Sequence, residues 1–367
     1  MTSSADRAGA VLRIDLDAIV ANWRNLSARL APGARAAAVV KADAYGLGAA
    51  HVVPALAAAG CARFVVATID EGLALRPLLP AATDILILCG PMPGTAGLLA
   101  EEGLTPVLNS PKQVADWAAE AKARRQRLPA ALHIDTGMAR LGLSPAQAQA
   151  LAGDQATLSA IDLKLVMSHL ACADAPAHAL NQAQLARFTA ARALFPGVPG
   201  SLAASSGIFL GPEWHADWVR PGAALYGVHP QPDGPNPMLP VVRLEGRILQ
   251  VRDVDAGETV GYGATHRCVG PGRLAIVGAG YADGLFRALG NHGSGHLGDC
   301  RVPLVGRVSM DLVTFDVTHA PAELARPGGL ITLIGPGNTV DDVARDGGTI
   351  GYEVLTALGR RYHRVWA

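Results

Sequence analysis

Lys41 is the residue whose type and position most suggest covalent chemistry, because it ends an apolar run in the segment VVKADAYGLG (39–48). The chain has only four lysines, and the other three lie in polar helical stretches or at the start of a strand. A lysine at the end of a buried strand is partly desolvated, so its amine loses a proton more easily and can form a Schiff base with an aldehyde. A lysine that simply reaches solvent from the strand end is the alternative interpretation.

Two loops farther along the chain have the composition of a phosphate site. Ser205 follows the apolar stretch SLAA, and the segment VRPGAALYG (219–227) places Gly222 and Ala223 at the start of a short helix. Backbone N–H groups at the start of a helix bind phosphate well. An amine and a phosphate cradle together match one cofactor that carries both an aldehyde and a phosphate, pyridoxal 5′-phosphate (PLP).

The elements that must position these residues alternate between helices and short apolar strands. Apolar runs joined by Ala- and Leu-rich helices indicate parallel strands that are buried on both faces. The first helix begins at Asp17. The eight predicted strands are 36–41, 64–69, 84–88, 105–108, 130–135, 163–168, 201–204 and 217–220. Eight such units predict a (β/α)₈ barrel, in which Lys41 and both loops lie on the catalytic rim, where barrels commonly bind phosphate.

A second domain follows the barrel. The Pro-rich segment 229–240 cannot pack as a helix and predicts a linker. Beyond it the sequence shows short β-type runs until about Ile350, where a helix and a final short strand are expected. We therefore predict a PLP-binding barrel over residues 1–232, whose first residues are free to pack with the second domain, and a mostly β domain over residues 233–367.

Composition and charge narrow the class of protein. Of 367 residues, 50% are hydrophobic and 17% are charged, which is ample material for a core and excludes a disordered chain. The apolar runs stay below the roughly 18 residues that a membrane span needs. Lys+Arg and Asp+Glu both number 31, so no basic surplus exists to bind nucleic acid.

The cysteines and the N-terminus indicate a reducing compartment. Five dispersed cysteines contain no C-x-x-C pair, which favours free thiols over disulfides and predicts no metal site. The segment MTSSADRAGA lacks the apolar stretch of a secretory signal. We therefore expect the protein in the cytoplasm.

Eight segments in order along the chain resemble alanine racemases, a family of fold-type III PLP enzymes. These segments are VVKADAYGLG, HIDTGMARLGL, VMSHLA, VRPGAALYG, VGYGAT, GYADG, VGRVSMDL and GYEVLTALGRR. The resemblance implies that the substrate is alanine, that D-alanine is supplied for peptidoglycan, and that the chain forms a head-to-tail homodimer whose active sites each use both chains.

The resemblance also implies a role for two bases. Racemisation removes a proton from one face of a planar carbanion and returns it to the other, so two bases must flank the substrate. Lys41 is similar to the lysine that carries PLP and serves the D-face, and Tyr262 is similar to the tyrosine that serves the L-face of the partner's site. Both side chains are normally protonated at neutral pH, so a neighbouring cation and release of the lysine from PLP must make them usable as bases.

The remaining roles carried over by resemblance concern the cofactor and the substrate. Arg220 would face the pyridine nitrogen, and because a guanidinium does not give up its proton, the ring nitrogen would stay unprotonated. His169 would link Arg220 to the tyrosine, and Arg140 and the backbone N–H of Met310 would bind the substrate carboxylate. The expected phosphate contacts are Tyr45, Ser205, Gly222, Ala223 and Tyr352, while Tyr281 and Tyr352 would line the entrance.

Two positions depart from the family pattern. His133 stands where many members have a carbamylated lysine that orients the arginine here numbered 140, and Ala204 stands where many have Asn. Three alternatives also stay open: a racemase of broader specificity, a decarboxylase of the same fold type, and a barrel-only PLP carrier. Arg220 disfavours the decarboxylase, which places a carboxylate at the pyridine nitrogen, and the β domain disfavours the carrier.

Overall fold

The computed structural model describes residues 4–231 and 233–367. By its internal packing the chain divides into two compact units. The barrel unit comprises Ile19–Leu225 and His229–Met238, and the β unit comprises the chain up to Ala18 together with Tyr226–Val228 and Leu239–Ala367. The units are not continuous in sequence, because the strand Ala10–Ile14 near the N-terminus packs in the β unit with residues of the C-terminal part of the chain.

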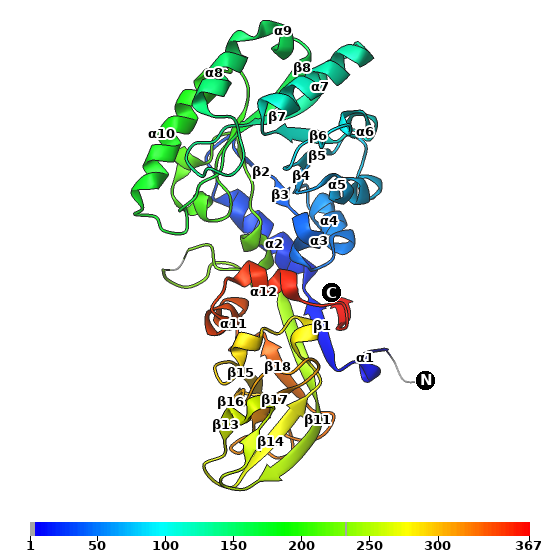
Figure 1. The fold of residues 1–367 in the computed structure, drawn as a ribbon, viewed down its shortest axis with the longest axis vertical. Coiled ribbons are helices and arrows are strands. Elements are labelled where there is room, and N and C mark those ends of the chain that lie inside the picture. The colour runs from blue at the N-terminus through cyan, green and yellow to red at the C-terminus, as the bar shows by residue number, and fades with distance from the viewer. Residues whose placement is uncertain (1–3, 232) are drawn as a thin grey trace. The chain divides into compact units, whose positions relative to one another are not determined.

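Eight parallel strands form the barrel (Figure 1). The first strand is interrupted and comprises β2 (Arg35–Ala36) and β3 (Ala38–Val39). The others are β4 (Arg63–Val66), β5 (Asp84–Ile87), β6 (Thr105–Leu108), β7 (Leu128–His133), β8 (Ile161–Met167), β9 (Gly200–Ser201) and β10 (Trp218–Val219). The ring closes because β10 pairs with β2, and a bridge joins Ala204 to Arg220. The predicted (β/α)₈ barrel is confirmed, with strand ends displaced by a few residues.

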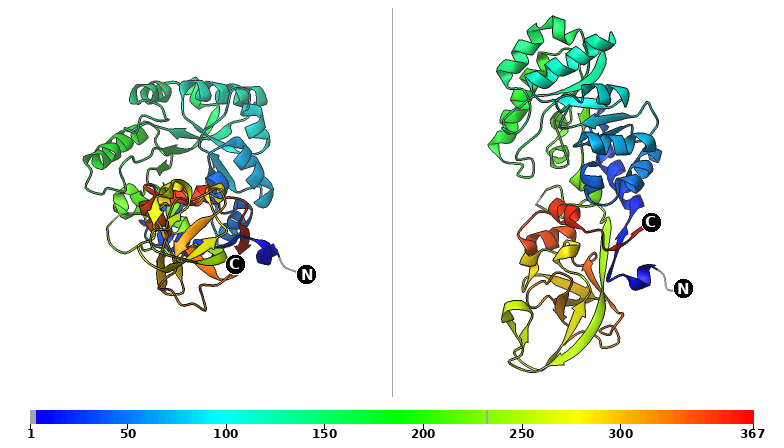
Figure 2. Two further views of the ribbon diagram at one scale, coloured as in Figure 1. Left: turned by 60° about the horizontal axis from the view of Figure 1, so that its bottom comes forward. Right: turned by 45° about the vertical axis from the view of Figure 1, so that its right-hand side comes forward.

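Helices surround the strands on the outside of this unit (Figures 1 and 2). Several begin at a polar capping residue: Thr68, Ser110 and Ser144 each accept a backbone N–H of the following first turn. The helices are α2 (Leu16–Ala28), α4 (Ala49–Ala58), α5 (Ile69–Leu75), α6 (Ala96–Glu101), α7 (Pro111–Arg124), α8 (Pro145–Gly153), α9 (Gln155–Leu158) and α10 (Ala179–Ala193). Short 3₁₀ turns are η1 (Arg76–Leu78), η2 (Ser206–Phe209), η3 (Pro212–Trp214) and η4 (Ala223–Tyr226).

The barrel interior is a packed layer of small and branched side chains. It consists of Ala37, Val39, Val65, Leu86, Val107, Ala131, Leu165 and Met167, all buried. Residues two apart on a strand point to the same face. The next inward positions toward the C-terminal ends of four of these strands are polar: Lys41, Asn109, His133 and His169.

The β unit is built around a long strand, β11 (Val242–Val254). Its neighbours are β1 (Ala10–Ile14), β14 (Gly272–Val277) and β18 (Leu330–Ile334), all antiparallel to it. β1 also pairs in parallel with β19 (His363–Trp366), which is the final strand expected from the sequence. The other strands are β12 (Thr259–Val260), β13 (His266–Arg267), β15 (Ser294–Leu297), β16 (Cys300–Pro303) and β17 (Val313–Asp316).

The β unit contains more helix than the sequence predicted. Besides α12 (Gly351–Ala357), which matches the predicted C-terminal helix, it has α11 (Val340–Gly347). α11 was missed because it is short and mostly polar, although a reciprocal cap between Thr339 and Asp342 opens it and Gly348 in the left-handed conformation ends it. The remaining short elements are α1 (Ser4–Arg7), η5 (Tyr262–Ala264), η6 (Tyr281–Asp283) and η7 (Arg287–Leu289).

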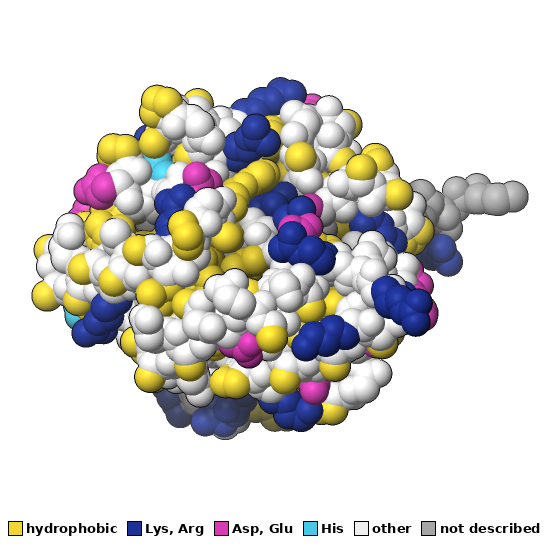
Figure 3. Space-filling view, turned by 90° about the horizontal axis from the view of Figure 1, so that it is seen from above, with side chains coloured by type: hydrophobic (Ala, Val, Ile, Leu, Met, Phe, Trp, Pro, Cys, Tyr) yellow, Lys and Arg dark blue, Asp and Glu magenta, His cyan; other side chains and the backbone are white. Residues whose placement is uncertain are grey.

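In the described part of the chain, no helix combines the length and hydropathy required of a membrane span. On the face shown in Figure 3, lysines and arginines lie in separate small groups among apolar and polar atoms rather than in one continuous basic patch.

Candidate active site

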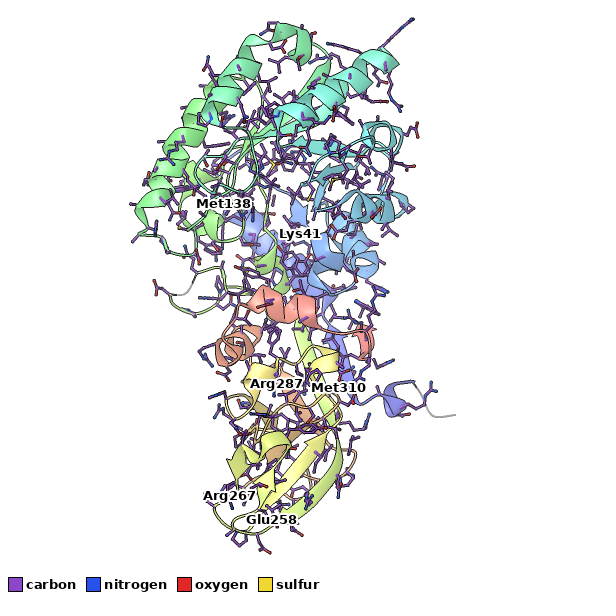
Figure 4. All side chains as sticks on the ribbon, viewed as in Figure 1. Lys41, Met138, Glu258, Arg267, Arg287 and Met310 are labelled. Atoms are coloured by element: carbon purple, nitrogen blue, oxygen red, sulfur yellow. The ribbon has the colours of Figure 1, made fainter. Side chains whose placement is uncertain are left out.

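Lys41, labelled in Figure 4, opens an unusual backbone turn, α3 (Lys41–Tyr45). The sequence predicted that Lys41 ends the first strand, whereas the strand ends at Val39 and the chain then becomes left-handed. The φ angles of residues 42–45 lie between 53° and 55°, although none of these residues is glycine. Left-handed backbone costs an L-residue roughly 1–2 kcal/mol, so the surroundings must hold this turn in place.

Hydrogen bonds within the segment contribute to that restraint. The N–H of Ala44 donates to the carbonyl of Val40 at 2.9 Å, and the N–H of Gly46 donates to the carbonyl of Ala42 at 2.7 Å. The carboxylate of Asp43 accepts the N–H of Ala49 at 2.7 Å, which joins the turn to the start of α4. These hydrogen bonds therefore hold the strained backbone turn that follows Lys41 in one conformation.

The environment of Lys41 favours its neutral amine. Burial lowers the pKa of Lys41, and the positive charge of Arg140 lowers it further. Glu71 and Cys89 act in the opposite direction, but the net pKa is below the ordinary value. A lowered pKa is what an amine needs in order to attack an aldehyde or accept a proton near neutral pH.

Arg220 is held rigidly at the end of β10 and is only 4% exposed. Its Nη2 donates to the carbonyls of Ser168 at 2.5 Å and Leu202 at 3.3 Å, and its Nη1 donates to the hydroxyl of Ser201. Burial lowers the pKa of Arg220 to about 10, so the guanidinium keeps its charge at neutral pH. The site therefore contains a fixed, buried positive charge.

His133 lies in the same layer and is also buried. Its Nδ1 is 2.8 Å from Oδ1 of Asn109, whose amide nitrogen already donates to two backbone carbonyls. Because that oxygen can only accept, Nδ1 of His133 carries the hydrogen. Burial, assisted by the neighbouring arginines, lowers the pKa of His133 to about 4, so the ring is neutral near pH 7. A neutral histidine thus stands where the resemblance described above implied a carbamylated lysine in many proteins.

His169 follows β8 at the same rim. Burial lowers its pKa to about 3, and the charge of Arg220 is the second cause. Gln184 donates to the carbonyl of His169 at 2.9 Å. The described residues show no hydrogen bond between the His169 ring and Arg220, so the predicted link from Arg220 through His169 to Tyr262 stays a prediction.

The four barrel residues predicted to hold the phosphate lie together. The hydroxyl of Ser205 accepts the N–H groups of Gly222 at 3.0 Å and Ala224 at 3.2 Å, which places it at the start of η4 beside Ala223. A Cβ at Gly222 would lie 2.3 Å from the hydroxyl of Tyr45, so only glycine allows this close approach. Ala204 contributes its backbone to a bridge with Arg220.

Arg140 is exposed in the loop after β7. Asp135 shapes that loop, because its carboxylate accepts the N–H groups of residues 137–139 at 2.9 to 3.3 Å. Burial alone would raise the pKa of Asp135, but these three donors more than offset it and hold the pKa below its usual value. The charge of Arg140 lowers the pKa of both Lys41 and His133, which places it near the same rim.

The other predicted residues lie in the β unit, and all carry exposed side chains. Tyr262 in η5 is 73% exposed, Met310 (labelled in Figure 4) is 53% exposed, and Tyr281 and Tyr352 are also exposed. The loops that carry Tyr281 and Met310 are joined, since the N–H of Ala282 donates to the carbonyl of Met310 at 3.0 Å. The structure thus gathers the site residues in two groups, one in each unit.

The barrel group suits an anionic aldehyde cofactor. No ion pair compensates Lys41, Arg140 or Arg220 within the described residues, so an anion bound at this rim would be stabilised by all three. The cradle of Tyr45 and the loop that begins at Gly222 provides the close approach that a phosphate requires, and Lys41 provides the amine. The residues present therefore fit PLP.

Comparison with known proteins decides the family. A model of the alanine racemase N-terminal domain matches residues 14–230, and a model of the alanine racemase C-terminal domain matches residues 241–366. The chain belongs to the alanine racemase family. The alanine racemase of Rhodospirillum rubrum is 55% identical over 359 residues, which cover 98% of this chain and 96% of that protein. The alanine racemase of Brucella abortus is 49% identical over 372 residues, which cover 98% and 94% respectively.

The solved structures agree. The crystal structure of alanine racemase from Bartonella henselae, with covalently bound pyridoxal phosphate, has a TM-score of 0.94 and 40% identity, and covers 98% of this chain and 100% of that one. Membership of the alanine racemase family makes this chain a PLP-dependent enzyme, which confirms the cofactor predicted from Lys41 and the two loops. Of the alternatives left open by the sequence, the racemase is the one that both domain models match.

Sequence reasoning missed the residues that hold the predicted ones. Ser201 and Ser168 receive the guanidinium of Arg220, Asn109 fixes the tautomer of His133, and Glu71 contacts the turn at Lys41. Glu71 had a local signal, because Thr68-x-x-Glu71 after an apolar run is the pattern of a reciprocal helix cap. The others have no such signal, since their partners lie on different strands.

Proposed function

We propose that this enzyme interconverts L-alanine and D-alanine with two bases, Lys41 from the barrel of one chain and Tyr262 from the β unit of a second copy. The observation that carries the proposal is the cation-lined barrel rim, where an amine of lowered pKa and a phosphate cradle accompany arginines without ion-pair partners. When bound, PLP withdraws electrons from the substrate carbon so that its α-proton can be removed.

The barrel residues divide the work of binding and proton transfer. Lys41 holds the cofactor through its ε-amine and, once released, accepts or returns the proton on the D-face of the substrate. Arg220 keeps its proton at neutral pH and so presents a donor, never an acceptor, toward the ring nitrogen. Tyr45, Ser205, Gly222, Ala223 and Tyr352 hold the phosphate. His169, half-buried and neutral, would link Arg220 to the incoming tyrosine.

The β unit supplies the second face. Tyr262 donates or accepts the proton on the L-face, and the backbone N–H of Met310 joins Arg140 in binding the substrate carboxylate. The high exposure of the Tyr262 and Met310 side chains supports a role that a second subunit completes. Tyr281 and Tyr352 line the entrance of the site in the resulting homodimer.

The cellular role follows from the same chemistry. We infer that the enzyme supplies D-alanine for peptidoglycan and works in the cytoplasm. Free cysteines support the second inference: each of the five is unpaired in the described residues, and Cys61 and Cys268 are buried.

Substitution of Lys41 tests the first base. Lys41→Ala should abolish covalent attachment of PLP, read from the absorbance of the bound cofactor, and should abolish racemisation, read by chiral chromatography of alanine. Lys164→Ala is the matched control, because Lys164 is exposed and forms an ion pair with Asp162. Retention of covalent PLP in the Lys41 variant would contradict the assignment.

Substitution of Tyr262 tests the second base and the shared site. Tyr262→Phe should slow exchange of the α-proton of L-alanine more than that of D-alanine, while PLP stays bound. Mixing the Lys41→Ala and Tyr262→Phe chains should restore about a quarter of the wild-type activity, since half of the dimers would each contain one intact site. No recovery in a mixture shown to contain heterodimers would exclude a site built from both chains.

A further inference from the structure

We propose that Glu71 is a positioning residue for Lys41: its carboxylate clamps the left-handed turn to the neighbouring strand and thereby aims the lysine amine. Glu71 lies in the first turn of α5, after strand β4. The inference rests on the proposed role of Lys41 as the residue that carries the cofactor.

The contacts of the Glu71 carboxylate reach two strand ends. Its Oε1 accepts the N–H of Ala42, the amide directly after Lys41, at 2.6 Å. Its Oε2 accepts the N–H groups of Ala67 at 2.7 Å and Thr68 at 3.2 Å, in the loop after β4. One side chain thus joins the peptide unit of Lys41 to the next strand of the barrel.

The carboxylate replaces a ladder hydrogen bond that the turn removes. The two strands pair up to Val40, whose N–H donates to the carbonyl of Val65 at 2.9 Å. The carbonyl of Val40 then accepts the N–H of Ala44 within the turn at 2.9 Å, so it is not the acceptor for Ala67. Glu71 satisfies the N–H groups on both sides of this break. Without it, the backbone N–H groups of Ala42, Ala67 and Thr68 would lose this acceptor.

Clamping matters at this position because the turn is strained. Four consecutive residues, 42–45, hold positive φ angles without a glycine among them. Such a turn persists only where its surroundings over-determine it. The N–H of Ala42 reports the orientation of the Lys41 peptide, so a carboxylate that fixes this N–H also fixes the direction in which the Lys41 side chain leaves the backbone.

Glu71 acts through the backbone rather than as a counter-ion. No ion pair joins Glu71 to Lys41 in the described part of the chain. The negative charge of Glu71 does raise the pKa of Lys41, but burial and Arg140 outweigh it. The hydrogen bond to Ala42 is therefore the contact through which Glu71 controls the lysine.

The test compares two substitutions in the same helix cap. Glu71→Gln is isosteric but leaves one carbonyl oxygen, so it cannot accept from both Ala42 and Ala67. Thr68→Val is the matched control, because it removes the hydroxyl that caps α5 at 3.4 Å but leaves every contact of the carboxylate. A role limited to helix capping would be lost equally in both variants.

Two measurements distinguish a role in positioning Lys41 from a general loss of activity. We expect Glu71→Gln to slow the attachment of PLP to apoprotein by about tenfold or more, followed by cofactor absorbance and by borohydride fixation to the Lys41 peptide. The α-deuterium isotope effect should rise with D-alanine and stay unchanged with L-alanine, because Lys41 serves the D-face. Thr68→Val should stay within about twofold of wild type in both measurements.

Two results would overturn the inference. One is attachment of PLP to Glu71→Gln at the wild-type rate, and the other is equal slowing in Thr68→Val. If Glu71→Gln does not fold, Glu71→Asp provides a second variant, since its shorter side chain keeps the charge but cannot span both amides. Amide exchange of the wild-type protein gives an independent measure: Ala42 should be protected as strongly as Val40, and rapid exchange at Ala42 would exclude the clamp.

Failure of this inference can be distinguished from failure of the proposed function. If Lys41→Ala loses covalent PLP while Glu71→Gln behaves as wild type, only the role of Glu71 is wrong. If Lys41→Ala retains covalent PLP, the assignment of the lysine itself is wrong.

Discussion

The two ends of the barrel differ in how their charges are compensated. At the N-terminal ends of the strands, Arg63 of β4 pairs with Asp84 of β5 at 2.8 Å, and the guanidinium lies 4.0 Å from the ring centre of Trp218. Asp84 also accepts the hydroxyl of Thr105 at 2.8 Å. At the C-terminal ends, Lys41, Arg140 and Arg220 have no carboxylate partner in the described residues.

The difference separates a structural end from a binding end. At the N-terminal end the charge of Arg63 is compensated within the chain by Asp84, so this pair contributes to stability without a ligand. At the C-terminal end, Arg220 is buried and Lys41 is half-buried, and no carboxylate among the described residues repays the desolvation of either cation. We propose that an anionic cofactor and the substrate carboxylate supply the missing charge. Substitutions at the two ends should therefore affect different measurements.

Removal of the fixed charge at the C-terminal end should give the largest effect on activity. Arg220→Met should lower kcat/KM for alanine by about 100-fold or more, equivalent to about 3 kcal/mol. Its effect on the unfolding free energy of the apoprotein should be smaller, because loss of three hydrogen bonds is offset by removal of a buried, unpaired charge. Arg124→Met, on the exposed face of α7, is the control. A kcat/KM within tenfold of wild type would refute the prediction.

Breaking the pair at the N-terminal end should have the opposite signature. Asp84→Asn leaves Arg63 mostly buried without a carboxylate and should lower the free energy of unfolding by about 2–3 kcal/mol, measured in urea. The kcat of the folded variant should stay within about twofold of wild type. Glu101→Gln removes a more exposed partner of Arg124 and should cost less than about 1 kcal/mol. A large loss of kcat in Asp84→Asn would contradict the assignment of stability to the N-terminal ends of the strands and of binding to the C-terminal ends.

The C-terminal end should also make the apoprotein sensitive to acid. The pKa of His133 falls from its ordinary value of 6.5 to about 4 on folding, so the unfolded chain binds more protons between these values. Stability must therefore fall as the pH decreases through this window, by about 2 kcal/mol between pH 7 and pH 5. His133→Gln should remove this part of the pH dependence in urea titrations, whereas the exposed His51→Gln should not. An unchanged pH dependence in His133→Gln would show that the ring is not buried in its neutral form.

Phosphate should supply a small part of the missing negative charge. At ten times its dissociation constant, inorganic phosphate should stabilise the apoprotein by about 1.4 kcal/mol. Ser205→Ala should reduce this gain, because the hydroxyl braces the N–H groups of Gly222 and Ala224. The neighbouring Ser206→Ala should keep it and controls for non-specific salt effects. Equal stabilisation of both variants would place the anion elsewhere.

Much of the fold could be predicted because its signals are local. Apolar runs between helical stretches identified all eight barrel strands, and the C-terminal strand and α12 were also expected. α11 escaped prediction since its apolar positions are few and its capping is its main signal. The separation of the domains near residue 233 and the catalytic roles of the named residues stay predictions, because they concern contacts with a cofactor, a substrate and a second chain.

The amino-acid pattern alone was sufficient to predict the barrel and the cofactor and to single out Lys41, whose role stays a prediction. Strand and helix periodicity, a scarce residue type and a glycine-rich loop are all read within a few neighbouring residues. Only the tertiary structure could decide that Lys41 sits on a left-handed turn, that Asn109 sets the tautomer of His133, and that the cations of one barrel end lack partners. Each of these depends on backbone groups and charges brought together from different strands, and no spacing along the chain encodes those distances.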